Sequence, residues 1–216
     1  MFSIESFKQT YETETVSVKV QDKPYSFIIP QNLDALMPRE GMQFPLWAKI
    51  WEAAIVLADH MVSPKMETSG TLLELGAGLG VTSVIADSHG YNVTATEYDS
   101  HAIQFIHANS HINECIDLRV DHLDWHNPKI DTTFDKIIGS ELIYKETDFE
   151  SLLALFKKFL KPDGEIYLAF EPRKATKSFL DMMSQWYQIG MWRKQWQSSE
   201  DTQKKTILVV RLIPKT

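Results

Sequence analysis

A short apolar run that ends in three alternating glycines constrains the fold of this 216-residue chain more than any other feature. Leu72-Leu73-Glu74-Leu75 leads directly into Gly76-Ala77-Gly78-Leu79-Gly80, and a helical apolar pattern follows from Val81. Glycine adopts backbone conformations that other residues avoid, so the chain can turn sharply here and present bare N–H groups to a ligand. The run therefore predicts a strand, a ligand-binding turn and a helix in succession.

The spacing of the glycines argues against two common nucleotide-binding motifs. In the dinucleotide fingerprint the third glycine stands three residues after the second, where this chain has Val81. No lysine followed by serine or threonine comes after the turn, as a nucleoside-triphosphate loop requires. NAD, FAD and nucleoside triphosphates are therefore disfavoured as ligands.

A carboxylate follows the second predicted strand. Glu97 stands directly after the strand predicted at 92–96, and it is 21 residues beyond Gly76. A carboxylate at the tip of the second strand can accept hydrogen bonds from both hydroxyls of a ribose. The glycine turn and this acid together indicate a ligand that contains ribose without phosphates.

Strand and helix patterns alternate from residue 71 onward. Strands are predicted at 71–75, 92–96, 116–120, 134–139 and 165–170, and helices near 80–89, 99–112, 148–160 and 174–189. Such alternation is typical of a mostly parallel sheet with helices on both faces and ligands at the carboxyl ends of the strands. The last two strands, at 192–197 and 206–213, have no room for a helix between them and predict an antiparallel hairpin.

The residues before this pattern are predicted to form an extension. Residues 14–20 alternate polar and apolar side chains, and 25–29 follow after a turn that contains Pro24, which predicts a β-hairpin. A helix is predicted from Pro45 to near Ser63-Pro64, because apolar side chains recur there at three- and four-residue steps. We expect an extension over residues 1–45 and an α/β domain over 46–216.

Composition indicates a cytoplasmic globular protein. No apolar run approaches the roughly 18 residues that cross a bilayer, and the first residues lack the basic and apolar regions of a signal peptide. Cys115 is the only cysteine, so no internal disulfide can form, and a reducing compartment fits. We expect no association with a membrane.

Charge and histidine spacing disfavour two further classes of ligand. Residues 91–150 hold twelve acidic and four basic residues, a balance of −8 in a chain whose net charge is −7. That surface should repel a phosphate backbone, so a nucleic-acid partner is not expected. His107, His111 and Cys115 are spaced by four residues, but no acidic or histidine cluster completes a site, and no metal is expected.

These motifs resemble those of the class I, seven-stranded S-adenosylmethionine-dependent methyltransferases over residues 46–216. Glu74-x-Gly76-x-Gly78-x-Gly80 matches their first motif, and Glu97 matches the acidic motif after the next strand. More narrowly, the resemblance is to the family 16 protein-lysine methyltransferases, which also carry an N-terminal β-hairpin. It rests on Leu46-Trp47-Ala48-Lys49-Ile50-Trp51-Glu52-Ala53-Ala54, Leu123-Asp124-Trp125 and Ser140-Glu141-Leu142-Ile143-Tyr144. The resemblance implies a Rossmann-like seven-stranded sheet and S-adenosylmethionine as the cofactor.

The resemblance also implies roles for individual residues. At the acceptor end, Glu141 would capture and orient a lysine cation, while Tyr144 would supply an aromatic wall and a hydroxyl. The usual family residue at position 141 is aspartate, so Glu141 is a departure with a longer side chain. Contacts with the cofactor are implied for Trp51, Glu74, Gly76, Ala77, Gly78, Gly80, Glu97, Ser140 and Trp125, the last against the adenine.

We therefore predict a monomeric N-methyltransferase that modifies a lysine of a partner protein. Two alternatives stay open. The first is a small-molecule N-methyltransferase on the same fold, because fold and cofactor site do not fix the acceptor. The second is a catalytically silent module that binds a partner. A nucleic-acid methyltransferase is disfavoured, because residues 140–144 lack an Asn/Asp-Pro-Pro-aromatic motif.

Replacement of Glu97 tests the predicted cofactor site. Glu97→Ala should leave two ribose hydroxyls poorly paired and weaken S-adenosylmethionine binding about a hundredfold, or about 2–3 kcal/mol. Titration calorimetry on the folded variant measures the change. An unchanged Kd would remove Glu97 from the site.

Overall fold

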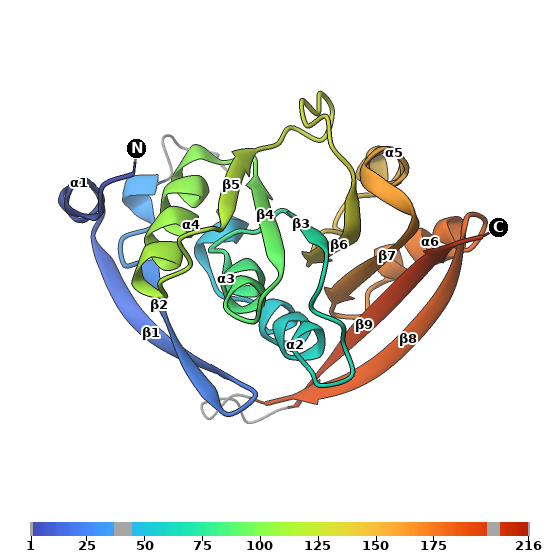
Figure 1. Cartoon of the computed structure of the whole chain (residues 1–216), viewed down its shortest axis with the longest axis horizontal. Helices are drawn as coiled ribbons and strands as arrows, with labels where there is room; N and C mark the ends of the chain where they lie inside the picture. Colours follow the sequence, from blue (N-terminus) through green and yellow to red (C-terminus); the bar gives the residue numbers. More distant parts are fainter. Residues whose placement is uncertain (1, 37–44, 198–203, 216) are drawn as a thin grey trace.

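Seven strands form one central sheet in the computed structural model, which describes residues 2–36, 45–197 and 204–215 (Figure 1). In spatial order they are β5 (Arg119–His122), β4 (Asn92–Glu97), β3 (Thr71–Leu75), β6 (Phe134–Ser140), β7 (Leu160–Phe170), β9 (Lys205–Pro214) and β8 (Tyr187–Trp196). The first five are parallel, and β9 runs antiparallel to both of its neighbours. This topology confirms the predicted Rossmann-like sheet with its C-terminal antiparallel hairpin, whose connecting residues 198–203 lie outside the described part.

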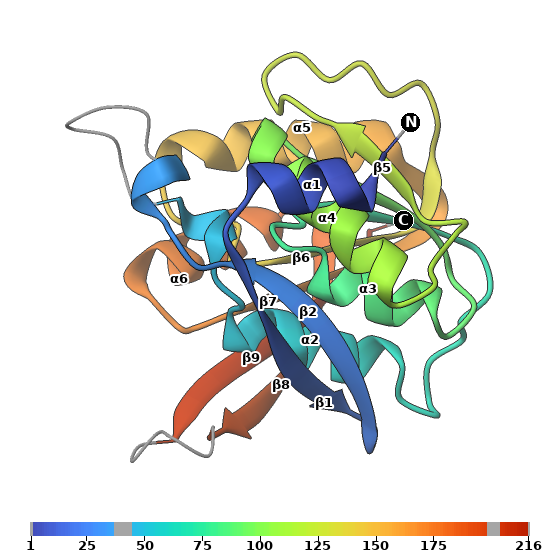
Figure 2. The same cartoon turned by 90° about the vertical axis from the view of Figure 1, so that its left-hand side faces the viewer.

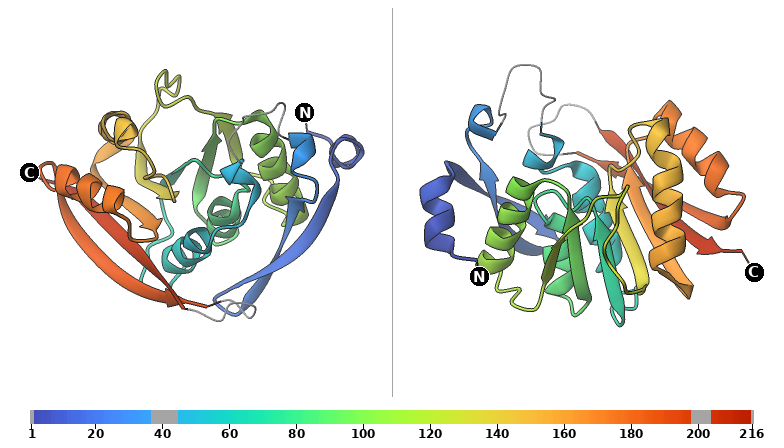
Figure 3. Two further views of the ribbon diagram at one scale, coloured as in Figure 1. Left: turned by 180° about the vertical axis from the view of Figure 1, so that it is seen from behind. Right: turned by 90° about the horizontal axis from the view of Figure 1, so that it is seen from above.

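Helices cover both faces of the sheet, as the alternating pattern predicted (Figure 3). One face packs against α2 (Glu52–Met61), α3 (Val81–Asp87) and α4 (Ser100–Ile112), and the other against α5 (Phe149–Phe159) and α6 (Lys174–Met183). Successive strand residues point to opposite faces, so Leu72 belongs to the first core and Leu73 to the second. None of the described helices is long and apolar enough to span a membrane.

The N-terminal segment packs along the α2–α4 face (Figure 2). It consists of α1 (Ile4–Thr10), which the sequence analysis did not predict, and a hairpin of β1 (Thr13–Val20) and β2 (Lys23–Pro30). The hairpin is confirmed, but the prediction that Pro24 lies in its turn is wrong. Gln21 and Asp22 form the turn with positive φ angles of 48° and 64°, and Pro24 is part of β2. The predicted domain boundary at residues 45/46 stays a prediction.

The helix predicted to begin at Pro45 begins seven residues later. The chain first makes a 3-10 turn at Leu46–Ala48, Lys49 is extended, and α2 starts at Glu52. The Trp51 indole donates a hydrogen bond to the Leu46 carbonyl at 2.7 Å, which closes the turn through a side chain. The apolar residues before Glu52, which are Trp47, Ile50 and Trp51, therefore do not lie on one helical face.

Two other predicted boundaries are wrong. The strand predicted at 116–120 begins at Arg119, because Glu114 has a φ of 60° and turns the chain so that Ile116 is 90% exposed. The helix predicted near 174–189 ends at Met183, and Tyr187 already starts β8. The buried residues Met183 and Tyr187 are four positions apart, which is a helical spacing. Tyr187, however, belongs to β8, which pairs with β9.

The fully buried side chain of Asn109, on α4, fastens the N-terminal hairpin to the glycine-rich segment that follows β3. Its Oδ1 accepts the Ile28 N–H at 2.6 Å, and its Nδ2 donates to the carbonyls of Ile28 at 3.2 Å and Leu79 at 2.9 Å. Ile28 belongs to β2, and Leu79 belongs to the glycine turn. One amide therefore ties the hairpin, α4 and the turn together.

Asn109→Ala should lower the free energy of unfolding by about 3 kcal/mol, because it leaves buried backbone groups without hydrogen bonds. Urea denaturation measures the loss, and Asn127→Ala, at an exposed site, serves as the matched control. Equal stabilities of the two variants would contradict the anchoring role of Asn109.

Glu74 is a buried acid on β3, 1% exposed, that contacts the start of α3. Its carboxylate accepts a hydrogen bond from the Ser83 hydroxyl. Burial raises the pKa of Glu74 to about 7, although the hydrogen bonds from Ser83 and Thr82 oppose the rise. The folded protein therefore holds a proton on Glu74 at pH values where the unfolded chain has lost it.

This pKa predicts a loss of stability as the pH rises from about 4.5 to about 7. The contribution is about 3 kcal/mol, complete below the unfolded pKa and lost through the folded one. Glu74→Gln should flatten the decline when urea unfolding is followed from pH 5 to 8. Ser83→Ala should move the decline to higher pH, and an unchanged profile in Glu74→Gln would contradict the assignment.

Candidate functional site

A cleft of about 380 Å³ opens at the carboxyl ends of β3, β4 and β6. Its walls come from the 3-10 turn before α2, the glycine loop (residues 76–80), the tip of β4 and the segment after β6. The predicted site residues that line it are Trp51, Gly76, Ala77, Gly78, Glu97, Trp125, Ser140, Glu141 and Tyr144. The structure therefore brings together residues that are up to 93 positions apart in the chain.

The glycine loop needs glycine for both its conformation and its packing. Gly76, Gly78 and Gly80 have φ angles of 60°, 58° and 77°, which L side chains rarely adopt. A Cβ on Gly76 would lie 2.9 Å from Cδ2 of Leu142, and one on Gly78 would lie 3.4 Å from the Trp47 carbonyl oxygen. The bare backbone of the loop therefore forms the floor of the cleft.

Glu97 fastens the glycine loop to the tip of β4. Its Oε2 accepts the Gly78 N–H at 3.0 Å, while Oε1 accepts the N–H groups of Tyr98 at 2.8 Å and Asp99 at 3.4 Å. Burial raises the pKa of Glu97, and these three N–H donors counteract the rise. The carboxylate faces the cleft in a fixed orientation and retains acceptor capacity there.

A second cavity of about 360 Å³ adjoins the cleft and extends it over the ends of β4 and β5. Trp125 lines both spaces, as do Gly76 and Glu97. An indole ring so placed offers a flat apolar surface next to the carboxylate and the glycine loop. The combined space suits a flat heterocycle joined to a ribose.

At the other end of the cleft lie Glu141 and Tyr144, which we call the acceptor pair. The Glu141 side chain is 5% exposed, its Oε1 accepts the Glu171 N–H at 2.7 Å, and its Oε2 accepts Nη1 of Arg173 at 2.6 Å. Burial raises the pKa of Glu141, while the Glu171 N–H and the Arg173 cation lower it. Glu141 itself has a φ of 51°, so the chain turns abruptly as it leaves β6.

Tyr144 is 38% exposed, and its ring lies beneath the Arg173 guanidinium, with 5.2 Å between the ring centroid and Cζ. Burial raises the pKa of Tyr144 to about 12, and the negative charge of Glu141 contributes to the rise. The phenol therefore stays protonated near neutral pH, where it can donate a hydrogen bond but cannot act as a base.

Two predicted cofactor residues do not line the cleft. Glu74 is buried below the loop against α3, and Gly80 is the N-cap residue of α3, where a Cβ would lie 3.1 Å from Cγ2 of Ile106. In the structure both support the shape of the loop from behind. A direct contact of either residue with a cofactor stays a prediction.

Arg173 and Leu142 were not among the site residues predicted from the sequence. Arg173 follows β7, the strand next to β6, so the sheet order places it beside Glu141. The pattern Glu171-Pro172-Arg173 at a strand end was the available signal, but it acquires meaning only once β6 and β7 are known to be neighbours. Leu142 looked like an ordinary apolar residue within the 140–144 motif.

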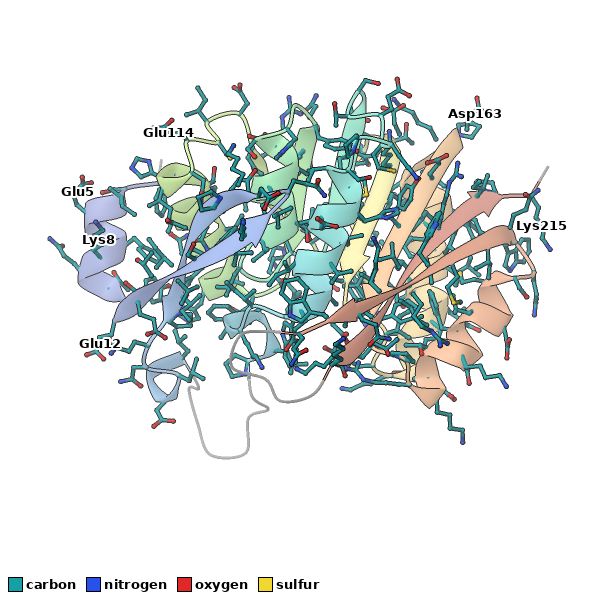
Figure 4. All side chains as sticks on the ribbon, turned by 90° about the horizontal axis from the view of Figure 1, so that it is seen from below. Glu5, Lys8, Glu12, Glu114, Asp163 and Lys215 are labelled. Carbon is teal, nitrogen blue, oxygen red and sulfur yellow. The ribbon has the colours of Figure 1, made fainter. Side chains whose placement is uncertain are left out.

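A larger cavity of about 880 Å³ lies at the opposite ends of the strands, and Asp163, labelled in Figure 4, is at its edge. It is lined by charges that pair with one another, such as Arg211 with Glu165. Parallel sheets bind ligands at their carboxyl ends, which favours the smaller cleft as the site. Within the described residues, no group of three His, Cys, Asp or Glu side chains could hold a metal ion.

Known proteins resemble this chain in sequence and in structure. EEF1A lysine methyltransferase 3 of Mus musculus is 31% identical over 138 residues, which cover 62% of this chain and 59% of that protein. Protein N-lysine methyltransferase METTL21A of Xenopus tropicalis is 30% identical over 159 residues, or 70% of this chain and 74% of that protein. The chain therefore spans less than two thirds of the length of the mouse relative.

A solved structure shares the fold at low sequence identity. Precorrin-6y C5,15-methyltransferase from Geobacter metallireducens superposes with a TM-score of 0.61 and 12% identity, covering 76% of this chain and 88% of that chain. At such identity the likeness concerns the fold alone.

The family described as lysine methyltransferase matches residues 34–186, well over half of the chain. The match includes the glycine loop, Glu97 and the acceptor pair, and it confirms the resemblance inferred from those motifs. The protein belongs to the lysine methyltransferase family.

Proposed function

We propose that this protein transfers a methyl group from S-adenosylmethionine to the side-chain amine of a lysine in a partner protein. The observation that carries the proposal is the composition of one cleft. The glycine loop, the Glu97 carboxylate and the Trp125 indole lie at one end. The buried Glu141 carboxylate and Tyr144 lie at the other. The names of the relatives support lysine as the acceptor.

The residues present fit the cofactor. The left-handed glycines leave bare backbone that a side chain would obstruct, Glu97 offers an acceptor to ribose hydroxyls, and Trp125 offers a ring surface. When bound, S-adenosylmethionine supplies a methyl group on a positively charged sulfur, and transfer to an amine breaks the C–S bond and forms a C–N bond. The glycine loop and Glu97 would fix the cofactor relative to the acceptor pair.

The acceptor pair handles the charge and the orientation of the amine. A lysine pKa of about 10.4 means that the neutral amine costs about 4 kcal/mol at pH 7. The Glu141 carboxylate attracts the ammonium and then accepts a hydrogen bond from the neutral amine, whose proton has passed to solvent. The Tyr144 ring forms an aromatic wall beside the amine, and the Tyr144 hydroxyl stays protonated. The main contribution of such a site to catalysis is to align the two reactants.

The other predictions about partners and location belong to this proposal. We propose a monomer that acts in the cytoplasm and does not use nucleic acid as substrate, in keeping with the acidic balance of residues 91–150. A small-molecule amine acceptor and a silent binding module are the alternatives to be tested.

The decisive experiment incubates the protein with cell lysate and tritiated S-adenosylmethionine, followed by mass mapping of the labelled residue. We expect label in one or a few protein bands, on a lysine Nζ. Label only in small molecules would support the small-molecule alternative, and methylated arginine would contradict the lysine assignment. No turnover to S-adenosylhomocysteine with any fraction would support the silent module.

Substitutions of Glu141 separate chemistry from cofactor binding. Glu141→Gln keeps the size and removes the charge, so transfer should fall about a hundredfold while the Kd for the cofactor stays near the wild-type value. Glu141→Asp should retain substantial activity, because it keeps the charge and restores the usual family residue. Glu150→Gln, an exposed carboxylate on α5, is the control. A wild-type rate in Glu141→Gln would refute the assignment of the acceptor pair.

A further inference from the structure

We propose that Arg173 is a positioning residue, which keeps the Glu141 carboxylate ionised and aimed into the cleft and holds the Tyr144 ring beside it. This inference rests on the proposed function and deepens it. Arg173 lies outside the walls of the cleft, whereas both members of the acceptor pair line it. It therefore acts on the acceptor through these two side chains.

The contacts of Arg173 join the acceptor pair into one unit. Nη1 donates to Oε2 of Glu141 at 2.6 Å, and the guanidinium lies over the Tyr144 ring at 5.2 Å. The remaining carboxylate oxygen of Glu141 accepts the Glu171 N–H, two residues before Arg173. Both oxygens of the carboxylate are therefore held by one short segment, which fixes its plane.

That segment is itself rigid. Arg173 is the N-cap residue of α6, where its N–H donates to Oγ1 of Thr176 at 2.8 Å and its carbonyl accepts the Thr176 hydroxyl at 2.7 Å. Thr176 is 3% exposed, so these bonds are shielded from water. The backbone that carries the guanidinium is therefore fixed to the first turn of α6.

The electrostatic surroundings explain why Glu141 needs this partner. Among the residues that the structure describes, three groups besides the Glu171 N–H face its carboxylate: the Arg173 cation, the Glu171 carboxylate and the Tyr144 phenol. Burial and the Glu171 charge raise the pKa of Glu141, whereas Arg173 lowers it. Without the guanidinium, a carboxylate so buried would hold its proton to higher pH and lose its attraction for an ammonium group.

A second arginine–glutamate pair offers a matched comparison. Arg211 on β9 pairs with Glu165 on β7, and the two arginine side chains are equally exposed, at 36% for Arg211 and 35% for Arg173. The Arg211 pair lines the cavity at the opposite end of the strands, away from the glycine loop. A variant without the Arg211 charge therefore measures how much stability is lost with an arginine–glutamate pair when the cleft is unchanged.

The first readout is the titration of Glu141 in the ligand-free protein, followed by 13C NMR of labelled glutamate and assigned with Glu141→Gln. Arg173→Gln keeps an N–H donor and removes the charge, so the midpoint should rise by about one pH unit or more. Arg173→Lys, which keeps the charge, should return it most of the way to the wild-type value. Arg211→Gln should leave it unchanged.

The second readout is the pH dependence of methyl transfer. In Arg173→Gln the acid limb of kcat should move to higher pH in parallel with the Glu141 midpoint, while the Kd for the cofactor measured by calorimetry stays within about twofold of wild type. Arg173→Lys should partly restore the profile. A purely structural ion pair would lower the melting temperature in both arginine variants and move neither titration nor profile.

An unchanged Glu141 midpoint in folded Arg173→Gln overturns the proposal, whether or not any acceptor is methylated. If the protein methylates nothing, the proposed function fails on its own, because the titration does not depend on turnover. If Arg173→Gln does not fold, the wild-type protein decides. The chemical shift of the Arg173 side-chain N–H must change over the pH range in which Glu141 titrates. An Arg173 resonance that does not change over that range overturns the proposal.

Discussion

The close packing of Leu142 against two glycines is the constraint on which the site depends. Its side chain occupies the space that a Cβ would need on Gly76, in the glycine loop, and on Gly139, near the end of β6. The positive φ of Glu141 turns the chain so that Leu142 reaches this position. Because there is no free volume at the contact, the loop after β3 and the loop after β6 keep one relative placement. The two ends of the cleft are therefore coupled by steric contact as well as by the sheet.

Buried polar groups hold this arrangement from below. Asn109 joins the N-terminal hairpin to the glycine loop, and Glu74 joins β3 to the first turn of α3. A polar group in a core is costly unless it is hydrogen-bonded, and both of these side chains are. The N-terminal hairpin is thus fixed to the same element that forms the floor of the cleft.

Two acids that line the cleft, Glu97 and Glu141, serve different purposes because their partners differ. Glu97 is surrounded by backbone N–H groups, which hold its carboxylate and shape the loop. Glu141 has one backbone N–H and a guanidinium, so its charge is balanced by a side chain from a different strand end. The first arrangement suits recognition of neutral hydroxyls, and the second suits a carboxylate that must stay ionised near an amine.

The sequence by itself determined the order of strands and helices from β3 to β9, the glycine loop and the acid at the tip of β4, because these depend on local periodicity and on the backbone freedom of glycine. It also determined the family, through short motifs that the family match confirms. The predicted start of α2 and the predicted end of α6 are wrong, because side chains that are buried by tertiary packing have a helical spacing there. Only the tertiary structure decided that β7 lies next to β6, and with it that Arg173 meets Glu141. Contacts between residues 32 positions apart depend on strand order, which no local pattern encodes.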